Sequence, residues 1–338
     1  MAIPSTPALR GQRDGIGFAT HAADMAAVWD ASAKDPRPLS LSALPVTPVV
    51  GAICPHDDYL YAGRVYREIL PALTARTVIV VGVFHAYARS GFRDRIVFDS
   101  HAHWRTPDGE IPVSDLRAEW QAHWRPTDWS VEDEMHDAEH SVEAIVYWLR
   151  HRHPAREIVP ILVPGMSLLR LLSLADGAAE ALAGVMSARG LALGSDVAIV
   201  ISADAVHYGP DFGHCPFGEG GIDAYRAAVD ADLDLLRTSI AGTVDSSRIA
   251  ALYETFVDPQ QPDRYRLTWC GRFSIPFGMA LLDGLHRRLG NAMTRALPIA
   301  YATSVGLPQL SVRGDLGLTA PASLYHFVGH PAVAFTSA

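Results

Sequence analysis

The hydrophobic pattern of this chain is a series of short, continuous apolar runs separated by longer amphipathic stretches. The runs are rich in Val and Ile and are bounded by glycine, proline or polar residues, which is typical of strands buried on both faces of a sheet. The stretches between them carry apolar residues at helical spacing. We expect strands at 47–53, 77–83, 157–163, 196–202 and 297–305. We expect helices at 21–32, 66–73, 139–152, 168–188, 222–240 and 275–290.

The alternation of strands and helices predicts an α/β fold, a single three-layer α/β/α sandwich with a mostly parallel or mixed central sheet. No break in composition is strong enough to divide the chain, so we expect one domain over 1–338. Within it, 1–45 would form an N-terminal helix and a proline-rich lead-in, since 34–48 is rich in proline.

A histidine lies within five residues of the end of three of the predicted strands. His56 follows the first strand, His85 the second and His207 the fourth. Ligands of open α/β sheets bind beyond the carboxyl ends of the strands, so these imidazoles are expected to share one site. Alone they indicate a metal site or an acid/base site. The carboxylates that accompany them are Asp57, Asp58 and Asp204.

Composition narrows the class of protein. The chain has 338 residues, 49% of them hydrophobic, and a net charge of −9, with Lys34 as its one lysine. No basic stripe supports nucleic-acid binding, and no apolar run is long enough for a membrane helix. Three cysteines without a CxxC pair exclude a disulfide framework and a zinc knuckle. Without a secretion signal we expect a cytoplasmic protein, and the preference for Arg over Lys suggests a GC-rich bacterial genome.

Five motifs, in order along most of the chain, resemble those of the Memo family, also called AmmeMemoRadiSam system protein B. The motifs are PHDDYLYAG (55–63), VVGVFH (80–85), DAEHSVE (137–143), ISADAVHYG (201–209) and WCGR (269–272). The family is similar in fold to class III extradiol ring-cleavage dioxygenases, which use non-haem iron(II) on an α/β sandwich. The resemblance therefore implies a Memo-like domain and an oxidoreductase that activates O2 on a small-molecule substrate.

Carried over by position, the resemblance places metal ligands at His56, His85 and Cys270, and an acid/base histidine at His207 with Asp204 beside it. Two imidazoles and one anionic ligand suit Fe(II), although copper and zinc remain alternatives. Cys270 lies at the expected start of a helix, which would lower the pKa of its thiol. Without the resemblance, a cysteine here would be read as a small buried apolar residue.

Asp57 and Asp58 depart from the family, which has Ala-Gly at these positions. One of them could ligate iron, giving a set of two histidines and one carboxylate. One could bind a cationic group such as an amine, or both could point to solvent and cap the turn. We place both among the substrate-binding candidates. The others are Tyr59, Tyr61, Tyr208, Glu139 and His140, and the role of Glu143 is left open.

Other assignments compete with an iron enzyme. HDAEH (136–140) fits the H-x-x-E-H pattern of inverted zinc peptidases, with His136 and His140 on one helix face. The pair His101 and His103 could bind a metal, but an exposed strand or loop is the preferred interpretation. A zinc hydrolase, a phosphopeptide-binding module and a copper redox protein are the alternative functions, and a homodimer is left open.

Overall fold

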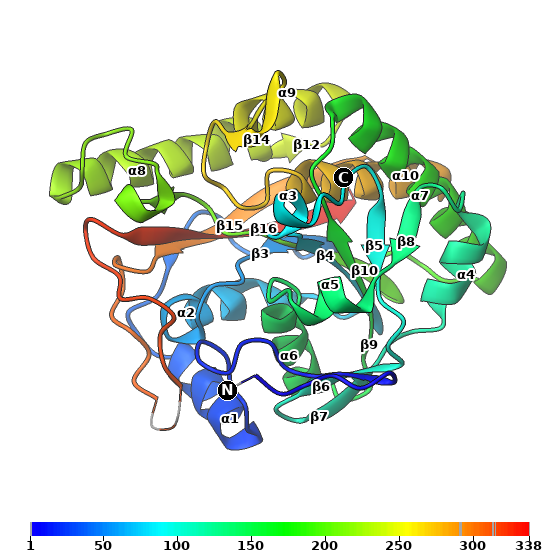
Figure 1. The fold of residues 1–338 in the computed structure, drawn as a ribbon, viewed down its shortest axis with the longest axis horizontal. Helices are drawn as coiled ribbons and strands as arrows, with labels where there is room; N and C mark the ends of the chain where they lie inside the picture. Colours follow the sequence, from blue (N-terminus) through cyan, green and yellow to red (C-terminus); the bar gives the residue numbers. More distant parts are fainter. Residues whose placement is uncertain (1, 291–292, 313, 315, 338) are drawn as a thin grey trace.

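The computed structural model describes residues 2–290, 293–312, 314 and 316–337, so the first and last residues of the predicted domain lie outside the described part. A large mixed sheet lies between two layers of helices (Figure 1). Across it the strands follow the order β12-β15-β16-β3-β10-β4-β9-β5-β8, with β2 beside β15 and β11 beside β16. The predicted α/β/α sandwich with a mixed sheet is confirmed.

The centre of the sheet is parallel. It consists of β3 (Val49–Cys54), β10 (Val197–Ser202), β4 (Thr77–Val83) and β9 (Glu157–Val163), in that spatial order. Nearly every side chain on these strands is buried, which explains why their sequences are apolar on both faces. All four strands were predicted to within two residues at each end.

The other half of the sheet is antiparallel and contains a strand that the pattern did not predict. β15 (Thr294–Thr303) matches an expected strand, but its neighbour β16 (Phe327–Ser337) was not expected. β16 lies between β15 and β3 and pairs antiparallel with both. It carries Pro331 in its middle, opposite Tyr301, and a proline normally counts against a central strand.

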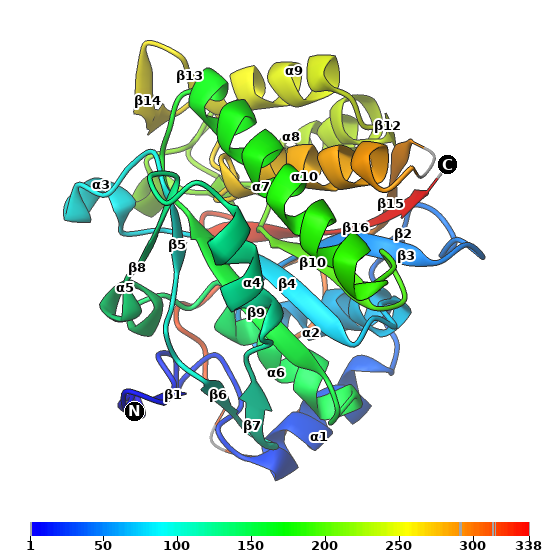
Figure 2. The same cartoon turned by 90° about the vertical axis from the view of Figure 1, so that its right-hand side faces the viewer.

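Two helical layers cover the sheet (Figure 2). The lower layer in Figure 1 contains α1 (Ala22–Ser32), α2 (Tyr59–Ile69) and α6 (Glu143–Arg152). The upper layer contains α7 (Leu168–Arg189) and α10 (Ser274–Arg288), which pack against each other. The remaining helices are α3 (Tyr87–Ser90), α4 (Leu116–His123), α5 (Asp133–Asp137), α8 (Ile222–Leu235) and α9 (Ser246–Phe256), with single turns at Leu70–Ala72, Pro210–Phe212 and Leu236–Ile240.

The remaining strands are short and lie at the margins. They are β1 (Leu9–Arg10), β2 (Leu39–Ser40), β5 (Ile96–Phe98), β6 (His103–Thr106), β7 (Gly109–Pro112), β8 (Trp129–Val131), β11 (His207–Tyr208), β12 (Gly242–Thr243), β13 (Val257–Asp258) and β14 (Gln261–Tyr265).

No helix among the described residues has both the length and the apolarity needed to cross a bilayer.

A buried ion pair joins the N-terminal segment to α6. The guanidinium of Arg10 contacts the carboxylate of Glu143, and both side chains are 1% exposed or less. The same guanidinium donates to the carbonyl oxygen of Glu139 at 2.6 Å. The carboxylate of Glu143 also accepts hydrogen bonds from the backbone N–H groups of Arg13 and Asp14. This explains the glutamate at the start of α6, whose role the sequence left open.

Candidate metal and substrate site

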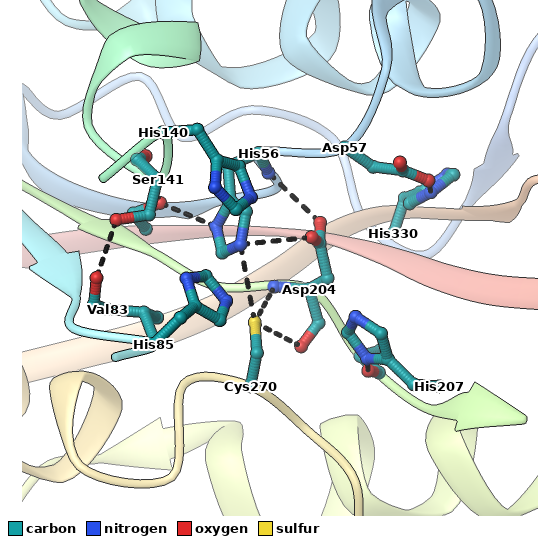
Figure 3. A network of polar contacts seen from close by, with 12 residues as sticks. His56, Asp57, Val83, His85, His140, Ser141, Asp204, His207, Cys270 and His330 are labelled. Atoms are coloured by element: carbon teal, nitrogen blue, oxygen red, sulfur yellow. Dashed lines mark hydrogen bonds and ion pairs between the residues drawn. The ribbon is translucent and has the colours of Figure 1, made fainter. Parts of the chain in front are cut away.

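Three adjacent parallel strands deliver the candidate residues to one edge of the sheet. Each of these residues lies two positions after the end of its strand: His56 after β3, Asp204 after β10 and His85 after β4. The three strands are neighbours in the sheet in that order. Because parallel strands present their carboxyl ends at the same edge, the three side chains meet although they are distant in sequence. Figure 3 shows the rings of His56 and His85 beside the sulfur of Cys270 and the carboxylate of Asp204 directed toward His56.

His56, His85 and Cys270 are brought together as expected. One ligand atom from each lies within 4.8 Å of the others. The Nε2 atom of His56 lies 3.6 Å from the sulfur of Cys270. On its other side the Nδ1 atom lies 2.8 Å from the hydroxyl of Ser202, which itself donates to the carbonyl oxygen of Ser141. The hydroxyl hydrogen is therefore engaged, so Nδ1–H is the donor and Nε2 has its lone pair free for a metal.

The charge state of His56 is consistent with a ligand role. Its side chain is 3% exposed, and burial together with the neighbouring His85 lowers the pKa of His56 well below its usual value. The ring is neutral near pH 7, which is the form that binds metals.

Glu139 supports His85. Its carboxylate accepts hydrogen bonds from the Nδ1 atom of His85 at 2.9 Å and from the backbone N–H of His85 at 2.8 Å. It also accepts from the N–H groups of His140 and Ser141. Burial opposes ionisation of Glu139, but His85 and these hydrogen bonds hold its pKa well below the usual range. The carboxylate is 4% exposed and supports His85, while the substrate-binding role expected for Glu139 stays a prediction.

His140 lies beside the two candidate histidine ligands. Its ring stacks on that of His85 with centroids 4.8 Å apart, and it lies 5.5 Å from the ring of His56. The side chain is 40% exposed, so it forms part of the accessible wall. Its contact with substrate stays a prediction.

Cys270 lies in a turn four residues before α10, so it does not occupy the helix start that we expected. The expected lowering of its pKa by a helix N-terminus is therefore wrong. Burial and the charge of Asp204 raise the pKa of the Cys270 thiol well above its usual value. The backbone N–H of Asp204 donates to the sulfur at 3.1 Å, and only a bound cation would supply the charge that makes a thiolate stable here.

Asp204 contacts His56 rather than solvent. One carboxylate oxygen accepts from the backbone N–H of His56 at 3.0 Å, and the other lies 3.4 Å from its Nε2 atom. Burial and the nearby charge of Asp57 raise the pKa of Asp204 to about 7. A second group of candidate ligand atoms within 4.8 Å of one another joins Asp204, His207 and Cys270.

His207 connects the candidate metal group to a cavity. Its Nδ1 atom lies within 3.1 Å of the carbonyl oxygens of Ala205 and Thr268. Carbonyl oxygens only accept hydrogen bonds, so Nδ1 carries the proton and Nε2 is free to accept one. Burial lowers the pKa of His207 to about 4. The ring lines a cavity of about 230 Å³, which Asp57 and Tyr61 also line.

The two consecutive aspartates point in different directions. Asp57 faces the cavity and pairs with His330 of β16, whose Nε2 atom lies 2.7 Å from the carboxylate. Asp58 is 3% exposed and accepts hydrogen bonds from the N–H and hydroxyl groups of Thr319. Asp58 therefore holds the 319 segment and does not point to solvent, while the substrate-binding role considered for it stays a prediction. Neither aspartate belongs to the groups of converging ligand atoms found among the described residues.

The three candidate tyrosines also separate. Tyr61 lines the cavity, and its hydroxyl contacts the backbone of Ala320 and Ala322. Tyr59 is fully buried and donates to the carbonyl oxygen of Ala144, while Tyr208 is fully buried and donates to that of Gly218. Tyr59 and Tyr208 fill core space and do not line this cavity, and a contact of either one with substrate stays a prediction.

The rival motifs do not assemble as metal sites. α5 ends at Asp137, so His136 and His140 do not share a helix face. His136 is buried and contacts the carbonyl oxygen of Val97. His101, expected to be exposed, is 2% exposed and contacts Asp99. Among the described residues, His140 belongs to a group of converging ligand atoms, whereas His136 and His101 do not.

Asp232 is a buried residue near the site that no sequence pattern singled out. Its carboxylate accepts hydrogen bonds from the indole of Trp269 at 2.7 Å, the hydroxyl of Tyr301 at 2.6 Å and the N–H of Val206 at 3.3 Å. A side chain at Gly329 would meet this carboxylate at 2.6 Å, which explains the glycine. Asp232 thus anchors the segments just before the candidate cysteine ligand and the candidate acid/base histidine.

We expect Asp232 to make stability depend on pH. Burial raises the pKa of Asp232 to about 6, although the hydrogen bonds from Tyr301 and Trp269 oppose this. The stabilisation from its proton is complete below about pH 4 and is lost as the pH rises through about 6. Relative to an Asp232→Asn variant, the wild-type free energy of unfolding should fall by about 3 kcal/mol between pH 4 and 7. Urea denaturation of both proteins across this range measures the difference, and parallel pH profiles would contradict it.

Several known proteins are similar to this chain in sequence. A family model described as Memo-like protein matches residues 24–317. A MEMO1 family protein from Pyrococcus abyssi is 28% identical over 199 residues, which cover 56% of this chain and 63% of the relative. One from Thermococcus kodakarensis is 28% identical over 50% of this chain and 56% of the relative. One from Archaeoglobus fulgidus is 30% identical over 48% and 57%. The matched region thus spans less than two thirds of the length of each of these archaeal relatives.

Proposed function

Because this chain belongs to the Memo-like protein family, we propose that it is a metal-dependent oxidoreductase that activates O2 on a small-molecule substrate. The observation that carries the proposal is the convergence of His56, His85 and Cys270 within 4.8 Å. Both imidazoles are oriented through Nδ1 by a hydrogen bond to another side chain, as is usual for metal-binding histidines.

The donor set fits iron(II) held by two neutral nitrogens and one thiolate, with copper and zinc as the competing ions. The chemistry that iron(II) supplies when bound there is activation of O2 beside the substrate. The protein itself orients His56 through Ser202 and His85 through Glu139. It also positions a proton acceptor, the Nε2 atom of His207, at the wall of the adjoining cavity.

The test is metal content by mass spectrometry on protein purified without oxygen, followed by O2 uptake with amine and catechol substrates. We expect about one iron per chain and O2 uptake that depends on substrate. Zinc without O2 uptake would instead establish a hydrolase on the same residues, and copper would shift the proposal to copper redox chemistry. Absence of bound metal would contradict the proposal and favour a binding module.

His207→Ala should lower substrate-dependent O2 uptake about 10²- to 10⁴-fold while leaving the metal content unchanged, because the imidazole is assigned to proton transfer. The two readouts are needed together, since His207 also lies within 4.8 Å of candidate ligand atoms of Asp204 and Cys270. If the variant lost its metal, His207 would be a ligand and its assignment as the acid/base group would be withdrawn.

A further inference from the structure

The cavity beside His207 has one carboxylate in its wall. Asp57, Tyr61 and His207 line it together with Phe212 and His326. The described residues of the lining include no lysine or arginine. The other lining residues are Ser304, Thr319, Ala320, Ala322 and Val328, all uncharged.

Two hydrogen bonds hold the carboxylate of Asp57 at the cavity wall. One oxygen accepts from the backbone N–H of Asp58 at 2.8 Å, and the other contacts the Nε2 atom of His330 at 2.7 Å. The Nδ1 atom of His330 is buried without a hydrogen-bond partner among the described residues. The ring of His330 therefore positions the carboxylate through Nε2, and the carboxylate keeps lone pairs for a further donor from the cavity.

The rest of the wall suits a cation as well. The rings of Phe212 and His326 stack with centroids 4.6 Å apart, and the ring of Tyr61 adds a further aromatic surface. Aromatic faces attract cations, and a carboxylate on the same wall gives an ammonium group a hydrogen-bonding partner. The carboxylate of Asp57 would repel an anionic group placed beside it.

We propose that this cavity binds a small molecule through a protonated amine that pairs with the carboxylate of Asp57. The cavity volume of about 230 Å³ corresponds to roughly eight water molecules, so the ligand is compact. His207 lies in the same wall, and the amine would hold the ligand against its Nε2 atom. The charge preference of the cavity is independent of the proposed function. The further step, that the amine is also the substrate of an O2-dependent reaction, rests on the proposed function.

The test uses three probes of similar shape and different charge: benzylamine, benzyl alcohol and benzoate. Binding to the purified metal-bound protein is measured by isothermal titration calorimetry at pH 7. We expect benzylamine to bind at least tenfold more tightly than either of the others. Equal or tighter binding of benzyl alcohol or benzoate would overturn the proposal.

Two variants locate the effect. Asp57→Asn keeps the shape of the side chain and should reduce benzylamine binding at least tenfold, to the level of benzyl alcohol. Asp30→Asn is the matched control, because this aspartate is exposed on α1 and is not among the lining residues, and it should leave benzylamine binding unchanged. Full retention in Asp57→Asn, or an equal loss in Asp30→Asn, would overturn the assignment. If Asp57→Asn does not fold, the wild-type charge preference still decides.

Metal content and O2 uptake measured on the same samples separate the two proposals. A preference for benzylamine in protein without O2 uptake would retain the amine site and remove the oxidoreductase. O2 uptake without a charge preference would retain the oxidoreductase and overturn the amine site.

Discussion

Replacing His56 with alanine is expected to strip the protein of its metal and to abolish metal-dependent turnover. The imidazole contributes one of three converging donors, and the other two cannot occupy its place at the end of β3. Removing even a supporting residue of a metal site typically costs about 10- to 100-fold in affinity, so the loss of a ligand should exceed that range. The measurement is metal per chain by mass spectrometry after dialysis, with circular dichroism to establish that the variant is folded.

Two further variants test whether the loss of metal is specific to a ligand. Ser202→Ala removes the hydroxyl that orients the His56 ring and should weaken metal binding by about 10- to 100-fold without abolishing it. His123→Ala removes an exposed histidine of α4 and should change nothing. A His56→Ala protein that kept about one metal per chain would show that the three donors do not form the site.

Replacing Arg10 with methionine should cost about 3–5 kcal/mol of unfolding free energy, the largest stability effect that we expect from one substitution. The change leaves the buried carboxylate of Glu143 without its counter-ion, while methionine retains much of the apolar contact. It also removes the hydrogen bond to the carbonyl oxygen of Glu139, which precedes the histidine stacked on His85. Weakened metal binding should therefore accompany the lower stability.

Chemical denaturation measures the effect, with Arg288→Met as the matched control. Arg288 pairs with Asp176 on the surface, where the aspartate is 59% exposed, so its loss should stay within about 0.5 kcal/mol. Equal losses of unfolding free energy in Arg10→Met and Arg288→Met would contradict the larger cost expected for breaking the buried ion pair.

The parallel half of the fold could be predicted because its strands are buried on both faces and read as continuous apolar runs. The antiparallel strand β16 could not, because Pro331 interrupts its sequence and its pairing partners lie far away along the chain. The start of α2 was also predicted too late in the chain. Tyr59 and Tyr61 were expected to be pocket residues of a loop, but they lie in the first turn of the helix.

For the candidate site, the strand-end rule brought His56, His85 and Asp204 to one place, and the position of Cys270 came from the family resemblance. The supporting partners could not be found from the sequence. His330 reaches Asp57 only through β16, and Asp232 reaches its three partners only through the packing of α8. No local pattern separates Asp57 from Asp58, because their roles depend on which distant segment each one contacts.

The position of β16 has a consequence for biosynthesis. Along the described chain it is the last strand to leave the ribosome, yet it occupies the middle of the sheet beside β3, about 280 residues earlier in sequence. At translation rates of about 5–20 residues per second, one edge of β3 stays open for tens of seconds while the rest is made. An open apolar strand edge is a template for aggregation, so the nascent chain should depend on chaperones until β16 inserts. The same insertion brings His330 to Asp57, so the cavity is complete only once β16 has inserted.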